Sequence, residues 1–131
     1  MIYDAIRKKY VLLTPEEWVR QHVVNLLVAY LHYPKSLVKL EGGHRYNTRL
    51  KRTDVLVFAN SGQPLLLVEC KAAHVKLTED VCRQLAVYNN TIQAPLVAIT
   101  NGLQFFVWRL DEANTCYHQL SEIPDYRSLP G

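Results

Sequence analysis

Two carboxylates and an ammonium group stand beside two short apolar runs in the middle of the sequence. Glu69 and Lys71 lie two residues apart at the end of one run, and Asp54 begins the other. Side chains two residues apart in a strand point to the same face, so we expect Glu69 and Lys71 to lie together while Cys70 points to the other face. A hairpin between the two runs would bring Asp54 beside Glu69.

This grouping suits the hydrolysis of phosphodiesters. Carboxylate oxygens bind hard divalent cations, a bound cation acidifies water, and a neighbouring lysine orients that water and offsets charge on the phosphate oxygens. Magnesium is the expected ion. A Glu-x-Lys tripeptide also occurs as a solvated ion pair at the end of a strand, so the tripeptide alone does not separate the two interpretations.

Two β-prone runs predict the hairpin that this arrangement needs. Residues 54–59 and 65–71 are rich in valine and leucine, and the Asn-Ser-Gly sequence at residues 60–62 is typical of a turn. A further strand is expected at residues 37–41, where apolar and polar residues alternate before Gly42-Gly43.

Two amphipathic helices are predicted, each with a threonine as its N-cap. The first follows Thr14 and runs to about residue 31, with Glu17 placed to complete a capping box. The second follows Thr78 and covers residues 79–90.

The last predicted elements are strands at residues 95–100 and 103–110, joined by the hairpin signal Asn101-Gly102, and a short strand around Tyr117. The resulting order α-β-β-β-α-β-β describes an α/β domain in which helices flank a mixed β-sheet. A single domain over residues 1–131 fits the length of the chain.

The composition indicates a folded chain without a membrane segment. Hydrophobic residues make up 49%, which is too apolar for a disordered tail, and the net charge of +3 permits a nucleic-acid partner. The most apolar stretch, residues 23–31, is far shorter than a spanning helix, and no secretory signal is recognisable, so we expect a cytoplasmic protein. The three cysteines are an odd number without paired spacing, which argues against a disulfide framework. Cys116 with His118 would need partners from elsewhere to bind zinc.

The residues around the carboxylates resemble the PD-(D/E)xK nuclease superfamily. The likeness is to the N-terminal nuclease domain of type I restriction enzyme R subunits, and it extends from residue 14 to residue 102. It implies a restriction-endonuclease-like fold with an α-β-β-β-α-β core. Thr53 stands where the name-giving proline would be, and the sequence has no Walker motif, so DNA translocation is not expected of this polypeptide. The matching segments are Arg52-Thr53-Asp54-Val55-Leu56-Val57, Pro-Leu-Leu-Leu-Val-Glu-Cys-Lys at residues 64–71, and Gln84 with Tyr88.

This resemblance implies a role for each matching residue of the hairpin. Asp54 and Glu69 would bind the metal together with the backbone carbonyl of Cys70, and Lys71 would be the catalytic lysine. The cofactor would be Mg²⁺, with Mn²⁺ able to replace it.

Residues of the two helices would complete the implied site. Many relatives add a metal-binding glutamate from the first helix, and the match falls on Glu17, with Glu16 as the alternative. A capping-box role explains Glu17 equally well. Gln84 and Tyr88 resemble the family's Gln-xxx-Tyr motif, in which they would brace the lysine or contact the DNA backbone. Tyr88 also fits a position in the hydrophobic core.

Basic residues directly before Asp54 are candidates for contacts with DNA phosphates. A charged, solvated hairpin edge explains them equally well. These residues are Arg45, Arg49, Lys51 and Arg52.

Together these features predict a magnesium-dependent DNA endonuclease of the restriction-enzyme kind. Its partners would be DNA and either a second copy of the chain or a larger restriction or helicase assembly, without a membrane. Two alternatives stay open. One is a DNA-binding module or subunit that does not cleave by itself, and the other is a nuclease-fold protein used for protein interaction or structural support.

Overall fold

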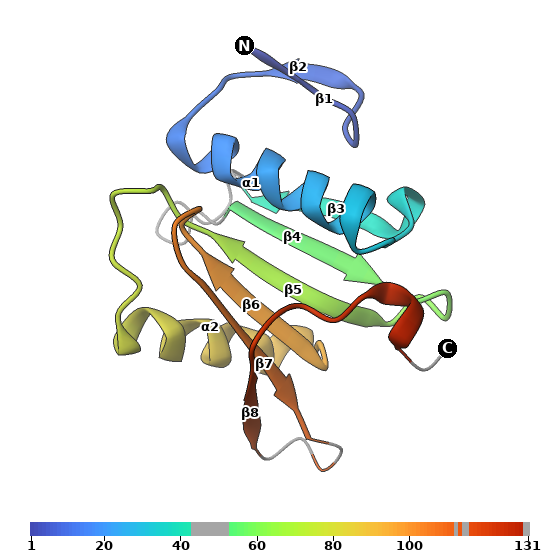
Figure 1. Cartoon of the computed structure of the whole chain (residues 1–131), viewed down its shortest axis with the longest axis vertical. Coiled ribbons are helices and arrows are strands. Elements are labelled where there is room, and N and C mark those ends of the chain that lie inside the picture. Colours follow the sequence, from blue (N-terminus) through green and yellow to red (C-terminus); the bar gives the residue numbers. More distant parts are fainter. Residues whose placement is uncertain (43–52, 112, 114–115, 130–131) are drawn as a thin grey trace.

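The centre of the protein is a six-stranded β-sheet, seen in a computed structural model that describes residues 1–42, 53–111, 113 and 116–129 (Figure 1). Only β5 and β6 of this sheet run parallel, and every other pair of neighbouring strands in it is antiparallel. The predicted α/β class with a mixed sheet is confirmed. In spatial order, which is also sequence order, the strands are β3 (Val38–Gly42), β4 (Thr53–Phe58), β5 (Pro64–Cys70), β6 (Leu96–Thr100), β7 (Phe105–Leu110) and β8 (Tyr117–Leu120).

Both predicted helices are present. Helix α1 (Pro15–Asn25) continues into a π-helical turn over Leu26–Tyr30, and α2 covers Glu79–Ile92. The predicted N-caps are confirmed, because the hydroxyls of Thr14 and Thr78 each accept a hydrogen bond from a backbone N–H three residues on. The other half of the expected capping box is wrong. The Thr14 N–H donates to the carbonyl of Leu12, and the Glu17 carboxylate is bound by other side chains.

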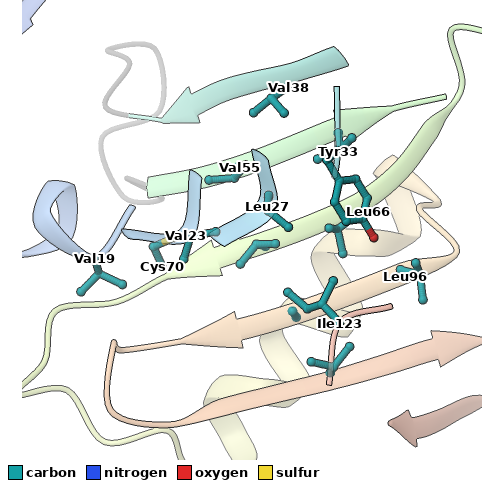
Figure 2. Close-up of a cluster of buried hydrophobic side chains, with 14 residues drawn as sticks. Val19, Val23, Leu27, Tyr33, Val38, Val55, Leu66, Cys70, Leu96 and Ile123 are labelled. Carbon is teal, nitrogen blue, oxygen red and sulfur yellow. The ribbon is translucent and has the colours of Figure 1, made fainter. Parts of the chain in front are cut away.

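The two helices cover opposite faces of the sheet (Figure 1). The face under α1 carries the larger hydrophobic core, in which Val19, Val23 and Leu27 pack toward Val55, Leu66 and Cys70 (Figure 2). The face under α2 carries a second core. It includes Leu56, Leu67, Leu85, Ala94, Val97 and Ile99.

A small hairpin precedes α1 and was not predicted from the sequence. Its strands are β1 (Ile2–Asp4) and β2 (Lys9–Val11). The buried carboxylate of Asp4 accepts hydrogen bonds from the backbone N–H groups of Ile6 and Arg7, and Lys8 takes the positive φ of +56° that closes the turn. Such a turn usually contains glycine, which explains why the sequence pattern missed it.

The β6–β7 hairpin is present where Asn101-Gly102 predicts it, with a longer loop than the two residues expected. Asn101 accepts hydrogen bonds from the N–H groups of Leu103 and Gln104. Gly102 has φ +89°, and a β-carbon there would lie 3.4 Å from Val19 of α1. The loop therefore packs against the beginning of α1. Among the described residues, no helix has the length and apolar character needed to cross a bilayer.

Candidate active site

Glu69 and Lys71 form an ion pair at the carboxyl end of β5. The distance from Lys71 Nζ to Glu69 Oε2 is 2.9 Å. The Glu69 side chain is only 5% exposed, whereas that of Lys71 is 31% exposed. A buried carboxylate thus faces an ammonium group that solvent can still reach, and the predicted convergence of these two groups is confirmed.

The register of the β4–β5 hairpin brings the backbone of Asp54 beside that of Glu69. Strands β4 and β5 pair so that Asp54 stands directly opposite Glu69, and Thr53 stands opposite Cys70. On the other side of β5, Glu69 pairs with Ile99 of β6. The predicted hairpin is therefore confirmed with the register that the site requires.

Cys70 lies on the opposite face of the sheet from Glu69. Its side chain is 2% exposed and belongs to the core under α1 (Figure 2). Leu67 belongs to the core under α2, and because side chains alternate along a strand, Glu69 points toward α2 as well. The chain after β5 is held in place, since the Lys71 N–H donates to the carbonyl of Thr100 over 2.8 Å.

Cys82 of helix α2 lies within range of the negative charge of Glu69. Burial raises the pKa of the Cys82 thiol, and the negative charges of Glu69 and Glu79 raise it further. Tyr88 is half-buried against the core under α2, as the core interpretation predicts. Gln84 is exposed, and among the described residues no hydrogen bond joins it to Lys71. The roles of Gln84 and Tyr88 toward lysine or DNA stay predictions.

Glu17 is surrounded by positive charge. Its carboxylate accepts hydrogen bonds from Arg20 Nη2 at 2.6 Å, Arg7 Nη2 at 2.8 Å and Gln21 Nε2 at 2.8 Å. Burial by itself would raise the pKa of Glu17, but the hydrogen bonds from Arg20, Gln21 and Arg7 outweigh it and lower the pKa to about 2. Glu17 thus ties the N-terminal hairpin to α1, and its role as a metal ligand stays a prediction.

The basic residues predicted to contact DNA, Arg45, Arg49, Lys51 and Arg52, lie outside the described residues. A different basic surface is visible beside the edge strand β3. Lys8, Lys35 and Lys39 are exposed and line one open cavity of about 610 Å³, between the turn of the N-terminal hairpin and residues 35–40. We call this surface the basic groove.

Sequence analysis missed the partners of two site residues. Arg7 and Cys82 come from elements whose approach to Glu17 and Glu69 depends on the tertiary fold. Arg20 offered a local signal, because residues three apart on a helix are neighbours and it follows Glu17 by three.

A comparison with protein families matches most of the chain. The family model described as type I restriction enzyme R protein N terminus (HSDR_N) matches residues 15–124, which include both helices and the whole of the central hairpin. No curated protein and no solved structure matches the chain significantly. Since the matched segment covers most of the 131 residues, the chain belongs to the family of type I restriction enzyme R protein N termini.

Proposed function

We propose that this chain is a metal-dependent DNA endonuclease domain of a restriction enzyme, with its active centre at Asp54, Glu69 and Lys71. The observation that carries the proposal is the ion pair between Glu69 and Lys71 at 2.9 Å, with Asp54 opposite Glu69 in the register of the hairpin. Family membership supports a restriction-enzyme role.

The donor set suits a hard divalent cation. Mg²⁺ prefers oxygen ligands, and the proposed ligands are the carboxylates of Asp54 and Glu69 and the backbone carbonyl of Cys70. When bound, Mg²⁺ or Mn²⁺ would lower the pKa of a coordinated water and offset charge on the phosphate oxygens. Burial of Glu69 favours such an ion, because opposite charges attract more strongly where water is excluded.

In the proposed reaction Lys71 positions the attacking water and the scissile phosphate. Its ammonium group donates hydrogen bonds and is half-buried, so it can reach a phosphate oxygen while Glu69 fixes its other side. Water attacks phosphorus, the bond from phosphorus to the leaving oxygen breaks, and that oxygen takes up a proton. Gln84 and Tyr88 are proposed to contact the DNA backbone from α2.

The proposed partner is DNA, with a larger restriction assembly or a second copy of the chain as the context for double-strand cleavage. The basic groove supports a DNA partner, because three exposed lysines that line one cavity attract the phosphates of a nucleic-acid backbone. Such contacts would orient the duplex without reading its sequence.

Cleavage of supercoiled plasmid and of single-stranded DNA tests the proposal. The parent protein is expected to nick DNA with Mg²⁺ or Mn²⁺ and to stop when EDTA is added. Lys71→Ala should lower the cleavage rate at least 100-fold, the scale of a transition-state charge contact. Lys76→Ala, which removes an exposed lysine five residues further on, should cut like the parent.

Two outcomes decide between the proposal and its alternatives. If Lys71→Ala and Asp54→Ala cut as well as the parent, and circular dichroism shows that both are folded, the assignment of the active centre is wrong. If the folded parent binds DNA without cutting under either metal, the chain is a binding module that depends on partner subunits. Failure to bind both metal and DNA would favour a role in protein interaction.

A further inference from the structure

A second cluster of possible metal ligands lies at the hairpin end of β7 and β8, outside the proposed nuclease site. The cluster consists of Asp111, Cys116 and His118. Each residue offers one ligand atom, and the three atoms lie within 4.8 Å of one another. Asp111 is partly exposed and the other two residues are exposed, so solvent and ions reach all three. The cluster combines a thiol, an imidazole and a carboxylate.

The hairpin brings these side chains together by its backbone pairing. Leu110 pairs with Tyr117, and beyond that pair the Asp111 N–H donates to the Cys116 carbonyl over 2.9 Å. The Cys116 N–H in turn donates to Asp111 Oδ1 over 3.3 Å. His118 follows Cys116 by two residues and so points to the same face of the strand. These hydrogen bonds therefore hold the backbones of the three residues close together before any ion arrives.

These donor types select a transition metal over magnesium. Thiolate and imidazole ligands suit Zn²⁺, and carboxylate oxygen completes sets of this kind in many zinc sites. A thiolate and a carboxylate together carry two negative charges, which neutralise a divalent ion, while the imidazole binds as the neutral base. Binding would release the thiol proton of Cys116 to solvent.

We propose that Asp111, Cys116 and His118 form a zinc-type transition-metal site with three protein ligands. The three-ligand set leaves a fourth position for water or an external ligand. Access to that position is open, because Asp111 and His118 line a cavity of about 600 Å³. A bound ion would join β7 to β8 at the end of their hairpin. Arg109 lines the same cavity, and its positive charge lowers the expected affinity.

This site is independent of the nuclease centre. Glu69 pairs with Ile99, which pairs with Phe106 near the beginning of β7, whereas Asp111 follows the end of β7. The two sites therefore lie at opposite ends of the sheet and on different strands. Loss of one leaves the other intact, so their tests are separate.

The test is titration of the metal-free, reduced protein with Co²⁺, followed by competition with Zn²⁺. Co²⁺ bound to thiolate gives a charge-transfer absorption in the near ultraviolet, and carboxylate ligands alone do not. We expect one thiolate-bound ion per chain, displaced by Zn²⁺. Cys116→Ser should abolish the band, and His118→Gln and Asp111→Asn should each weaken binding at least tenfold. The three positions are exposed or partly exposed, so the variants should fold.

Control variants make the outcome specific. Cys82→Ser removes the partly buried thiol of α2, and Glu69→Gln removes the proposed Mg²⁺ ligand. Both should keep the charge-transfer band. The proposal is overturned if no band forms at stoichiometric Co²⁺, or if Cys82→Ser abolishes the band while Cys116→Ser keeps it. Nicking assays on the Cys116→Ser protein are expected to match the parent, whatever the result for the metal.

Discussion

Two buried glutamates in this protein have very different surroundings. Glu69 forms an ion pair with the partly exposed ammonium group of Lys71, whereas Glu17 accepts hydrogen bonds from two guanidinium groups and an amide. An arginine is always charged and binds a carboxylate at fixed angles, while a lysine is a mobile point charge. The surroundings of Glu17 are suited to holding two segments together, and those of Glu69 fit its proposed role as a metal ligand.

The first prediction at the residue scale concerns Glu69. Glu69→Gln keeps the size of the side chain and removes its charge, so we expect metal-dependent cleavage to fall at least 100-fold while the protein stays folded. Nicking rates across a range of Mg²⁺ concentrations measure this effect. Glu122→Gln, at an exposed position, is the matched control and should cleave like the parent. Equal rates for the two variants would contradict the role of Glu69.

The second prediction concerns the pKa of Glu17, which is lowered from 4.5 to about 2. A carboxyl with a lowered pKa in the folded state stabilises the protein above the unfolded pKa, and this stability is lost as the pH falls from 4.5 toward 2. Glu17→Gln should therefore lower the free energy of unfolding by about 2–4 kcal/mol at pH 7, because Arg7 and Arg20 each lose one ion-pair partner.

Urea unfolding between pH 7 and pH 2.5 measures this effect. The difference between the parent and Glu17→Gln should shrink below pH 4.5, the window in which Glu17 of the parent takes up its proton. Glu16→Gln removes the neighbouring, less buried carboxyl and should follow the parent throughout. A constant difference at every pH would show that the charge of Glu17 is not the cause.

At the scale of elements, one buried amide connects the end of α2 to the chain just before β6 and to β8. Asn89 is 1% exposed; its Nδ2 donates to the carbonyl of Ala94 and to Tyr117 Oη, and its Oδ1 accepts from the Ala94 N–H. Asn89→Ala leaves buried backbone groups without a partner, so we expect it to lower the free energy of unfolding by about 2–4 kcal/mol.

Thermal or urea unfolding of Asn89→Ala checks this expectation. Asn90→Ala is the matched control, because Asn90 follows directly and is exposed, and its effect should stay within about 0.5 kcal/mol of the parent. Alanine is a better helix former than asparagine, so helix propensity alone would make both variants slightly more stable. A loss for Asn89→Ala no larger than that for Asn90→Ala would contradict the role of the buried amide.

Elements with a strong local pattern could be predicted, and those fixed by distant contacts could not. The β4–β5 hairpin and both N-caps follow from alternation, turn residues and threonine, and the period of two places Glu69 and Lys71 on one face. The N-terminal hairpin has strands of only three residues, and its turn depends on the Asp4 carboxylate.

The π-helical turn and the contact of Arg7 with Glu17 could not be predicted from the sequence either. The apolar residues Leu26–Tyr30 fit any helix, and only the hydrogen bond from the Leu31 N–H to the Leu26 carbonyl, five residues back, defines the π-turn. Arg7 reaches Glu17 across ten residues of sequence because the hairpin folds onto α1. Contacts of this kind depend on packing, which no local pattern encodes.

At the scale of the whole molecule, the basic groove should contribute to the affinity for DNA. Replacing Lys8, Lys35 and Lys39 together by glutamine removes three cations from one cavity. The slope of log K against log salt for a short duplex should become shallower by about 2–3, since each phosphate contact contributes ~0.9 to that slope. Fluorescence anisotropy over a range of salt concentrations measures it.

A charge-matched variant distinguishes the effect of the basic groove on DNA binding from the effect of the net charge of the protein. Replacing Lys9, Lys76 and Arg83 by glutamine lowers the charge of the chain equally, at exposed positions outside the groove. Its salt slope should stay close to that of the parent. If both triple variants reduce the slope by the same amount, the lysines of the groove act only through the general field of the protein.

The order of the strands has a consequence for how the molecule is made. Each strand from β4 to β8 lies beside the one that precedes it in the sequence, so the six-stranded sheet has no strand that must be inserted between two others. Pairing between close neighbours closes short loops and speeds folding. The sheet can therefore grow from β3 outward as the ribosome delivers each strand, and only the β5–β6 step must wait for α2 to emerge.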